Sequence, residues 1–212
     1  MGVVENLQQL KSKLPKQITL VAVSKTKSNK AILEAYSQGH RIFGENKVQE
    51  LVKKHEDLPK DIQWHMIGHL QSNKVKYIAP FVHLIHGVDS LKLLKEIDKR
   101  AKQNNRIIDC LLQVHIAQEN TKFGFGLDEI EDVVKDVERY KYVNIKGMMG
   151  MASFTTNKTQ IKTEFTQLKT LFDSLKNEQI NILSIGMSAD YELAICKGST
   201  MIRVGSAIFG AR

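Results

Sequence analysis

The sequence predicts a single-domain (β/α)8 barrel of the TIM type, and three observations support this fold class. About eight short apolar segments alternate with amphipathic segments of helical period along the 212 residues, as in parallel β/α proteins. No proline-rich linker, composition break or charged tail interrupts the series, so we expect one domain over residues 1–212. Glycine and polar residues follow the apolar segments, where a barrel carries its functional groups. An open doubly wound sheet is the alternative, but that architecture has fewer strands as a rule.

The expected strands are short runs rich in branched apolar residues. They cover residues 18–24, 41–45, 61–68, 82–88, 107–116, 143–151, 181–186 and 201–208. The expected helices carry apolar residues spaced three or four apart. They cover residues 3–14, 28–36, 47–55, 72–80, 90–101, 128–137, 161–175 and 191–197. Ser28, Ser90 and Asp128 are the expected N-caps, and Pro80 stops the fourth helix.

The composition is that of an ordinary globular protein, 42% hydrophobic and 25% charged, with a formal net charge of +8. Basic residues are spread along the chain and alternate with acidic ones, as in residues 92–100, and aromatic residues make up only 7%. Solvated helix faces explain this pattern better than a nucleic-acid interface, so we expect no nucleic-acid partner. An anionic small ligand would also suit the positive field.

The chain carries no sign of export, membrane insertion or metal binding. Residues 1–16 are polar and lack the apolar core of a signal peptide, and no apolar stretch reaches the length of a membrane span. Cys110 and Cys196 have no metal-like spacing and suit a reducing compartment, while His65 and His69 lack a third ligand. We therefore expect a cytoplasmic protein without a metal site or a membrane segment.

Lys25 directly follows the first expected strand and is the first candidate for chemistry. An ammonium at the end of a buried strand must be paired, hydrated or used in a reaction. One use is a Schiff base with a carbonyl ligand, to which a partly desolvated lysine is suited. The alternative is a structural lysine whose charged end reaches solvent.

The last two strands end in glycine and serine, at residues 186–188 and 205–206. Barrels frequently bind phosphate with the loops after strands seven and eight, and glycine lets the backbone approach the ligand. Arg203 shares a strand face with Gly205, so it would point toward the same site. A buried arginine needs a carboxylate or a ligand atom, and an ion pair with Glu45 is the structural alternative.

With these residues in view, the chain resembles the pyridoxal phosphate homeostasis protein family (the YggS/PROSC type) over nearly its whole length. The segments that carry the resemblance are VAVSKTK at 21–27, FGENKVQE at 43–50, WHMIGHLQSNK at 64–74, GMSAD at 186–190 and MIRVGSAIFGAR at 201–212. Each segment is short, but their order and spacing together are highly specific. Ser28 stands where many members have proline, and Ser206 where threonine is common; neither change removes a needed group.

The resemblance implies a barrel like the N-terminal domain of alanine racemases, with pyridoxal 5′-phosphate as its cofactor. Lys25 would carry the Schiff base, Asn46 would lie beside the cofactor, and Arg203 would face the pyridine nitrogen. The phosphate would be held by Ser188, Gly205 and Ser206. The family is described as holding or protecting the cofactor without turnover, and the implied partners are the cofactor and apo forms of enzymes that use it. A monomer is expected by resemblance.

The arginine bears on mechanism because its charge disfavours protonation of the pyridine nitrogen and so weakens the ring as an electron sink. Since the sequence ends at Arg212, we expect no second domain that would supply the tyrosine acid/base of the racemases. We therefore expect a non-catalytic cofactor-binding protein. A racemase-like enzyme is the alternative, with Tyr191 or His69 as the proton carrier, and an RNA-binding barrel is a third hypothesis.

Overall fold

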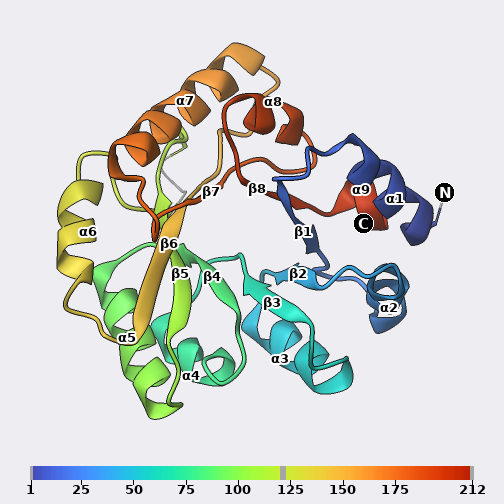
Figure 1. The fold of residues 1–212 in the computed structure, drawn as a ribbon, viewed down its shortest axis with the longest axis horizontal. Coiled ribbons are helices and arrows are strands. Elements are labelled where there is room, and N and C mark those ends of the chain that lie inside the picture. Colours follow the sequence, from blue (N-terminus) through green and yellow to red (C-terminus); the bar gives the residue numbers. More distant parts are fainter. Residues whose placement is uncertain (1, 120–122, 211–212) are drawn as a thin grey trace.

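Eight parallel strands form a closed barrel in the computed structural model, which describes residues 2–119 and 123–210. The strands follow one another around the barrel in chain order (Figure 1). They are β1 Thr19–Val23, β2 Ile42–Glu45, β3 Gln63–Met66, β4 Leu84–Val88, β5 Ile108–Val114, β6 Val143–Gly150, β7 Ile182–Ser184 and β8 Met201–Val204. The predicted fold class is confirmed.

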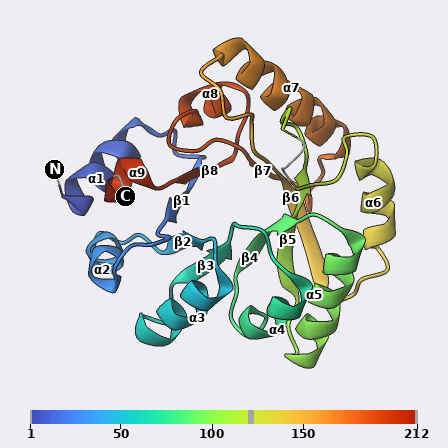
Figure 2. The ribbon, with the colours of Figure 1, turned by 180° about the vertical axis from the view of Figure 1, so that it is seen from behind.

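The helices lie outside this barrel and cover its outer face, as the two opposite views show (Figures 1 and 2). They are α1 Val3–Lys13, α2 Asn29–Ser37, α3 Val48–Asp57, η1 Ser72–Lys74, α4 Val75–Ile78, α5 Leu91–Gln103, α6 Ile130–Val137, α7 Lys158–Leu175, α8 Tyr191–Cys196 and α9 Ser206–Phe209. Over the described ranges, every helix is too short or too polar to span a bilayer.

The barrel closes where the first strand pairs with the last. Val21 lies opposite Arg203, and Ala22 lies opposite Val204. Outside the barrel, the Asn6 side chain of α1 donates a hydrogen bond to the Ile208 carbonyl of α9 at 3.1 Å, so the first and last helices also lie side by side. This closure brings the loops that follow β1 and β8 to the same end of the barrel.

Apolar side chains fill both faces of the sheet. The larger core lies between the strands and the helices and includes Phe43, Trp64 and Phe165, all fully buried. A smaller inner cluster lies on the opposite strand face, inside the barrel: Val21, Val23, Ile67, Leu84, Leu111, Met149 and Met201. The barrel interior is therefore packed, as the fold requires, and leaves room for a ligand only at its ends.

Strand β6 contains an extra residue that changes its alternation. On β5, Cys110 pairs with Ile145, but the next residue, Leu111, pairs with Gly147, so Lys146 has no partner in the register. Gly147 has φ +154°, and a Cβ there would lie 1.8 Å from the Ile182 carbonyl oxygen of β7. Only glycine allows this close approach at the bulge.

Two end signals were predicted correctly and a third was wrong. Ser28 accepts a hydrogen bond from the Ala31 N–H, and Ser90 accepts one from the Leu93 N–H, both at 3.3 Å. Asp128 is not the N-cap of α6. The helix follows Glu129, which is already helical and whose carboxylate instead accepts a hydrogen bond from the Gly126 N–H at 2.6 Å.

Several strands are shorter than expected, and the difference matters most at the end of the chain. The last strand was expected to run to Ile208, but β8 ends at Val204. Gly205 turns the backbone, and its carbonyl accepts hydrogen bonds from the N–H groups of Ile208 and Phe209, both at 2.9 Å. The short helix α9 replaces the second half of the expected strand, because local backbone hydrogen bonds are made there in place of ladder bonds.

Candidate functional site

All six residues singled out from the sequence line one cavity at the carboxyl end of the strands. The cavity has a volume of about 470 Å³, and the six are Lys25, Asn46, Ser188, Arg203, Gly205 and Ser206. They come from the loops or ends of β1, β2, β7 and β8, which are far apart in the sequence. The apolar part of the wall includes Val23, Ile67 and Met151. Residues 120–122 lie outside the described residues.

Lys25 stands in a tight turn at the end of β1. The Lys27 N–H donates to the Ser24 carbonyl at 3.0 Å, which closes the turn around Lys25 and Thr26. Thr26 has φ +64°, a conformation that a β-branched residue rarely adopts. Its N–H donates to the Glu50 carboxylate at 2.6 Å. The turn that aims Lys25 at the cavity is therefore strained and is held by a partner from α3.

A buried ion-pair network supports this turn. Lys54 is 4% exposed, and its ammonium donates to the Ser24 carbonyl at 2.8 Å, the Glu45 carboxylate at 2.8 Å and the Glu50 carboxylate at 2.6 Å. The Ser24 hydroxyl also donates to Glu45 at 2.5 Å. Burial raises the pKa of Glu45, and the hydrogen bonds from Lys54 and Ser24 oppose that rise. The network ties the end of β1 to β2 and α3.

This network excludes the predicted alternative partner of Arg203, the carboxylate of Glu45. Glu45 pairs with Lys54, so the ion pair between Glu45 and Arg203 that the sequence left open is not formed. Sequence analysis missed Lys54 altogether. The signal was present, since Glu50 and Lys54 are four residues apart on an expected helix that directly follows Glu45, but such spacing is also common on solvated helices.

Arg203 is buried beside the cavity without a carboxylate partner. Its guanidinium donates to the Ser184 carbonyl at 2.8 Å, the Ser184 hydroxyl at 2.6 Å and the Gly150 carbonyl at 3.0 Å. The residue is 4% exposed, and no salt bridge to it occurs among the described residues. Burial lowers its pKa to about 10. The site therefore holds a cation whose charge no acid neutralises at contact distance.

The loops after β7 and β8 are joined at the cavity wall. The Gly205 N–H donates to the Ser188 hydroxyl oxygen at 3.1 Å, and the Arg203 N–H donates to the Gly186 carbonyl at 3.0 Å. Gly186 has φ +97°, and a Cβ there would lie 2.6 Å from the Ala194 side chain. The two glycine–serine segments are thus joined by a hydrogen bond at the cavity wall, and their role as a phosphate site stays a prediction.

The two residues considered as proton carriers do not line this cavity. The His69 ring pairs with the Asp89 carboxylate at 2.9 Å and stacks on Phe123 at a centroid distance of 3.8 Å. The Tyr191 hydroxyl donates to Glu192 at 3.3 Å. Within the described ranges, no group of three or more His, Cys, Asp and Glu residues could hold a metal ion.

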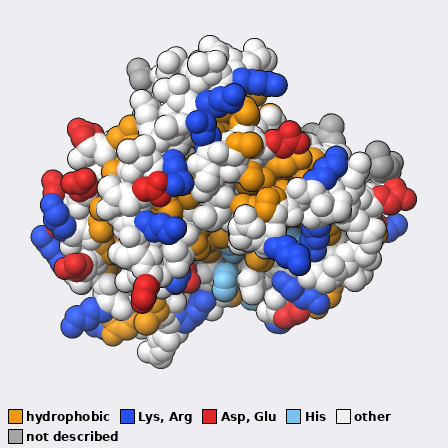
Figure 3. All heavy atoms as spheres, turned by 45° about the horizontal axis from the view of Figure 1, so that its top comes forward, with side chains coloured by type: hydrophobic (Ala, Val, Ile, Leu, Met, Phe, Trp, Pro, Cys, Tyr) orange, Lys and Arg blue, Asp and Glu red, His pale blue; other side chains and the backbone are white. Residues whose placement is uncertain are grey.

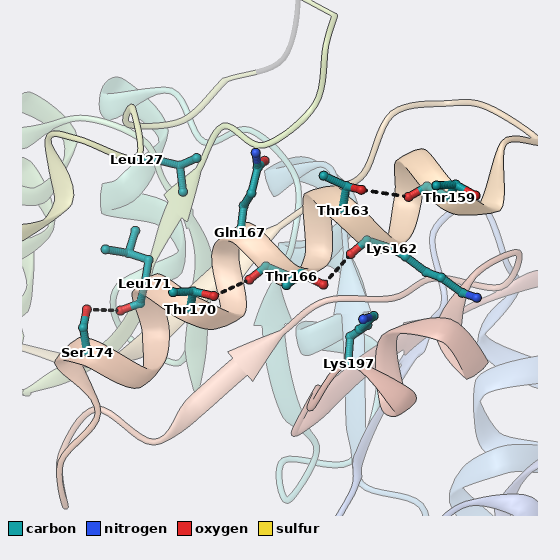
Figure 4. Close-up of a pocket in the computed structure, with 10 residues that line it drawn as sticks. All are labelled: Leu127, Thr159, Lys162, Thr163, Thr166, Gln167, Thr170, Leu171, Ser174 and Lys197. Carbon is teal, nitrogen blue, oxygen red and sulfur yellow. Dashed lines mark hydrogen bonds between the residues drawn. The ribbon is translucent and has the colours of Figure 1, made fainter.

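A larger hollow of about 680 Å³ lies on the outside of the barrel along α7, but its chemistry is that of an ordinary surface (Figure 4). The hydroxyls of Thr163, Thr166 and Thr170 donate to carbonyls four residues earlier on the same helix. These polar groups therefore satisfy the helix and do not converge on a ligand. On the face in Figure 3, basic side chains are likewise dispersed, with acidic ones between them.

Three buried histidines lie outside the cavity lining. Burial lowers the pKa of His40 to about 4 and that of His65 to about 3, and it lowers the pKa of His86 well below its ordinary value. All three are therefore neutral near neutral pH. His65 and His86 lie inside the barrel below Arg203, whereas His40 precedes β2 and bonds to the Ile42 carbonyl at 2.9 Å.

Comparison with known proteins gives consistent relatives. The family model for the alanine racemase N-terminal domain matches residues 3–212. Two proteins called pyridoxal phosphate homeostasis protein are similar over 197 residues each. The one from Aquifex aeolicus is 39% identical and is matched over 91% of this chain and 86% of its own length. The one from Helicobacter pylori is 42% identical, over 91% and 87%.

Solved structures of related proteins have the same fold. PipY of Synechococcus elongatus superposes with a TM-score of 0.92 without PLP, at 36% identity, over 98% of this chain and all of PipY. With PLP bound, the TM-score is 0.89 at 35% identity and the same coverage. Alanine racemase of E. faecalis shares the fold, with a TM-score of 0.78 at 17% identity. This chain matches 58% of that protein.

Replacement of Lys54 by methionine should lower the free energy of unfolding by about 3–5 kcal/mol, because it leaves the carboxylate of Glu45 buried without its cation. Lys53→Met is the matched control, since the Lys53 side chain is 77% exposed and its one ion-pair partner among the described residues is Asp57, at 3.4 Å. It should change stability by less than about 0.5 kcal/mol. Urea denaturation measures both, and equal losses would contradict the role given to Lys54.

Stability should decrease on acidification below about pH 6.5, the ordinary pKa of an unfolded histidine. The folded pKa values of His40 and His65 are lowered, so the unfolded chain binds more protons between pH 6.5 and about 4. The free energy of unfolding then falls by about 1.4 kcal/mol per pH unit for each such histidine. Urea denaturation from pH 7.5 to 5 measures this slope. His40→Gln should reduce it, and an unchanged slope would argue against a neutral buried His40.

Proposed function

The chain belongs to the alanine racemase N-terminal domain family and, within it, to the pyridoxal phosphate homeostasis proteins, and on this premise we propose that it binds pyridoxal 5′-phosphate in the cavity at the carboxyl end of the barrel. The observation that carries the proposal is the convergence of an amine, a guanidinium and two hydroxyl-bearing loops on one cavity. PipY, whose structure is known with PLP bound, has the same fold at 35% identity.

The residues of the cavity fit this cofactor chemically. The Lys25 amine would condense with the aldehyde of the cofactor to a Schiff base, with loss of water. Ser188, Ser206 and the backbone at Gly205 would bind the phosphate, to which hydroxyls and N–H groups donate. Asn46 would lie beside the ring. The cavity volume of about 470 Å³ is in the range of small-molecule sites.

Arg203 supports a holding function without turnover. When bound, the cofactor supplies an aldehyde and a ring that withdraws electrons when its nitrogen is protonated. A cation that faces that nitrogen disfavours its protonation, and Arg203 makes no contact ion pair with a carboxylate of the described residues, although Asp190 lies near enough to favour its charged form. Tyr191 and His69, the two proton carriers considered, have other partners outside the cavity. Neither of the two proton carriers considered from the sequence therefore supports the racemase alternative.

We extend the proposal to the surroundings of the protein. A protein that holds the cofactor reversibly would supply it to apo forms of the enzymes that use it, in the cytoplasm and as a monomer of one domain over residues 1–212. The RNA-binding alternative requires a concentrated basic surface, whereas basic and acidic residues alternate along the sequence and are interspersed on the face shown in Figure 3.

Lys25→Ala should abolish covalent attachment of the cofactor. The protein is mixed with pyridoxal 5′-phosphate, reduced with borohydride and mapped by peptide mass spectrometry, and the absorption band of the bound cofactor is recorded. Lys27→Ala is the matched control, because Lys27 lines the same cavity while its ammonium donates to the Phe209 and Gly210 carbonyls. It should keep the attachment.

Modification of another lysine in the unaltered protein would overturn the assignment of Lys25. Incubation with L- and D-alanine followed by chiral analysis tests the holding function separately. Turnover that disappears in Lys25→Ala would favour the racemase alternative.

The double variant Ser188→Ala with Ser206→Ala should bind pyridoxal 5′-phosphate at least about 100-fold more weakly, because hydrogen bonds to charged groups contribute about 1.5–3 kcal/mol each and two are lost. Ser37→Ala is the control, since this hydroxyl is exposed and donates to the Glu34 carbonyl at 2.7 Å. Fluorescence titration measures the dissociation constants. Unchanged affinity in the double variant would count against a phosphate site at these loops.

A further inference from the structure

A chain of buried polar side chains leads from Arg203 into the barrel interior. The Ser184 hydroxyl, which accepts from Arg203 at 2.6 Å, lies 3.2 Å from His86 Nδ1. His86 Nε2 in turn lies 3.0 Å from His65 Nδ1. Ser184 and His86 are fully buried and His65 is 2% exposed. These residues come from β8, β7, β4 and β3, so the chain crosses the barrel.

The hydrogen-bond roles along this chain follow from the arginine at its end. A guanidinium only donates, so the Ser184 oxygen accepts and its own hydrogen needs another acceptor. His86 Nδ1 is that acceptor if it carries no proton. Neutral His86 then has its proton on Nε2 and donates it to His65 Nδ1. The reverse order would leave the Ser184 hydroxyl hydrogen without a partner, and we assign the first order for that reason.

The far end of the chain has an energetic cost that packing does not explain. In the assigned order, His65 carries its proton on Nε2, a buried atom with no hydrogen-bond partner among the described residues. Such a group costs about 1–3 kcal/mol. The neighbouring positions of the barrel interior hold valine, leucine and methionine, so an apolar filling suits this space. The presence of two histidines at these positions therefore needs a reason other than packing. Their hydrogen bonds lead to Arg203, which supplies one.

The groups that face the chain leave it neutral. Arg203 lies at one end, and at the other the His83 ring stacks on His65 at a centroid distance of 5.6 Å. His83 is itself influenced by Asp109 and Arg106. Burial is the main cause that lowers the pKa values of His65 and His86; His83 lowers that of His65 further, and His65 and Arg203 lower that of His86 further. A carboxylate would orient the guanidinium and also neutralise its charge. The neutral side chains of Ser184, His86 and His65 orient the guanidinium without neutralising it.

We propose that Ser184, His86 and His65 are positioning residues that fix the guanidinium of Arg203 toward the ring nitrogen of the cofactor while leaving its full positive charge facing the cavity. This inference rests on the proposed function. It gives these interior residues a role in setting the protonation state of the pyridine ring of the bound cofactor. That protonation state distinguishes a protein that holds the cofactor from an enzyme that uses it in a reaction.

The test compares Ser184→Ala, His86→Leu and His86→Asn with His40→Leu, a buried histidine outside the chain. Each is measured for pyridoxal 5′-phosphate affinity, for the pH dependence of the absorption band of the bound cofactor, and for urea stability without cofactor. Ser184→Ala and His86→Leu should weaken affinity about tenfold and shift the pH dependence of the band. His86→Asn, whose amide oxygen can accept from Ser184, should restore most of both. His40→Leu should change neither.

Each variant is also combined with Arg203→Gln. If the chain acts through Arg203, Ser184→Ala and His86→Leu should have no further effect on affinity in that background. Additive effects, or a His86→Leu protein that binds like His40→Leu, would overturn the inference. If His86→Leu does not fold, the smaller change Ser184→Ala decides by the same two readouts. Failure of the proposed function is distinguishable, because the unaltered protein would then bind no cofactor at all.

Discussion

The pairing of β1 with β8 is the contact on which the rest of the molecule depends. It joins strands separated by nearly the whole chain, and it sets Val21 opposite Arg203. The cavity exists only because this pairing brings the loop at Lys25 to the loop at Gly205. Contacts so distant in sequence form late and slowly as a rule, because the intervening chain must be ordered first. The site is therefore a property of the completed barrel and of no smaller unit.

The site contains two buried cations that the fold treats in opposite ways. Lys54 pairs with Glu45 and Glu50, so its charge is neutralised and it connects the end of β1, β2 and α3. Among the described residues, Arg203 donates hydrogen bonds to carbonyl and hydroxyl oxygens and makes no contact ion pair, so its charge remains available. Neutralised charge stabilises geometry, and unneutralised charge acts on a ligand. Burial of a cation thus stabilises the fold at Lys54 and supplies a charge for ligand binding at Arg203.

Much of the fold and the cavity could be predicted from the sequence because both follow from local patterns. Alternating apolar segments predict the barrel, and the strand-end rule selects Lys25, Ser188 and Gly205 without knowledge of any contact. The partners of buried charges could not be predicted in this way. Lys54 had the spacing of an ordinary surface helix residue, and His65 and His86 lie on different strands whose relative height depends on register. The helix that begins at Ser206 was not predicted, because the apolar run at residues 201–208 suits either a strand or a helix.

The bulge at Lys146 has a consequence for what the loss of a single residue from β6 would do. Before it, Val143 and Ile145 face the helices; after it, Met148 faces them and Met149 faces the barrel interior. The extra residue therefore inverts the inside–outside alternation of β6 just before Gly150, whose carbonyl receives Arg203 at 3.0 Å. A deletion of one residue at this bulge would turn the rest of the strand over and displace the Gly150 carbonyl, four residues away, from Arg203. The length of β6 therefore matters to the site independently of its side chains.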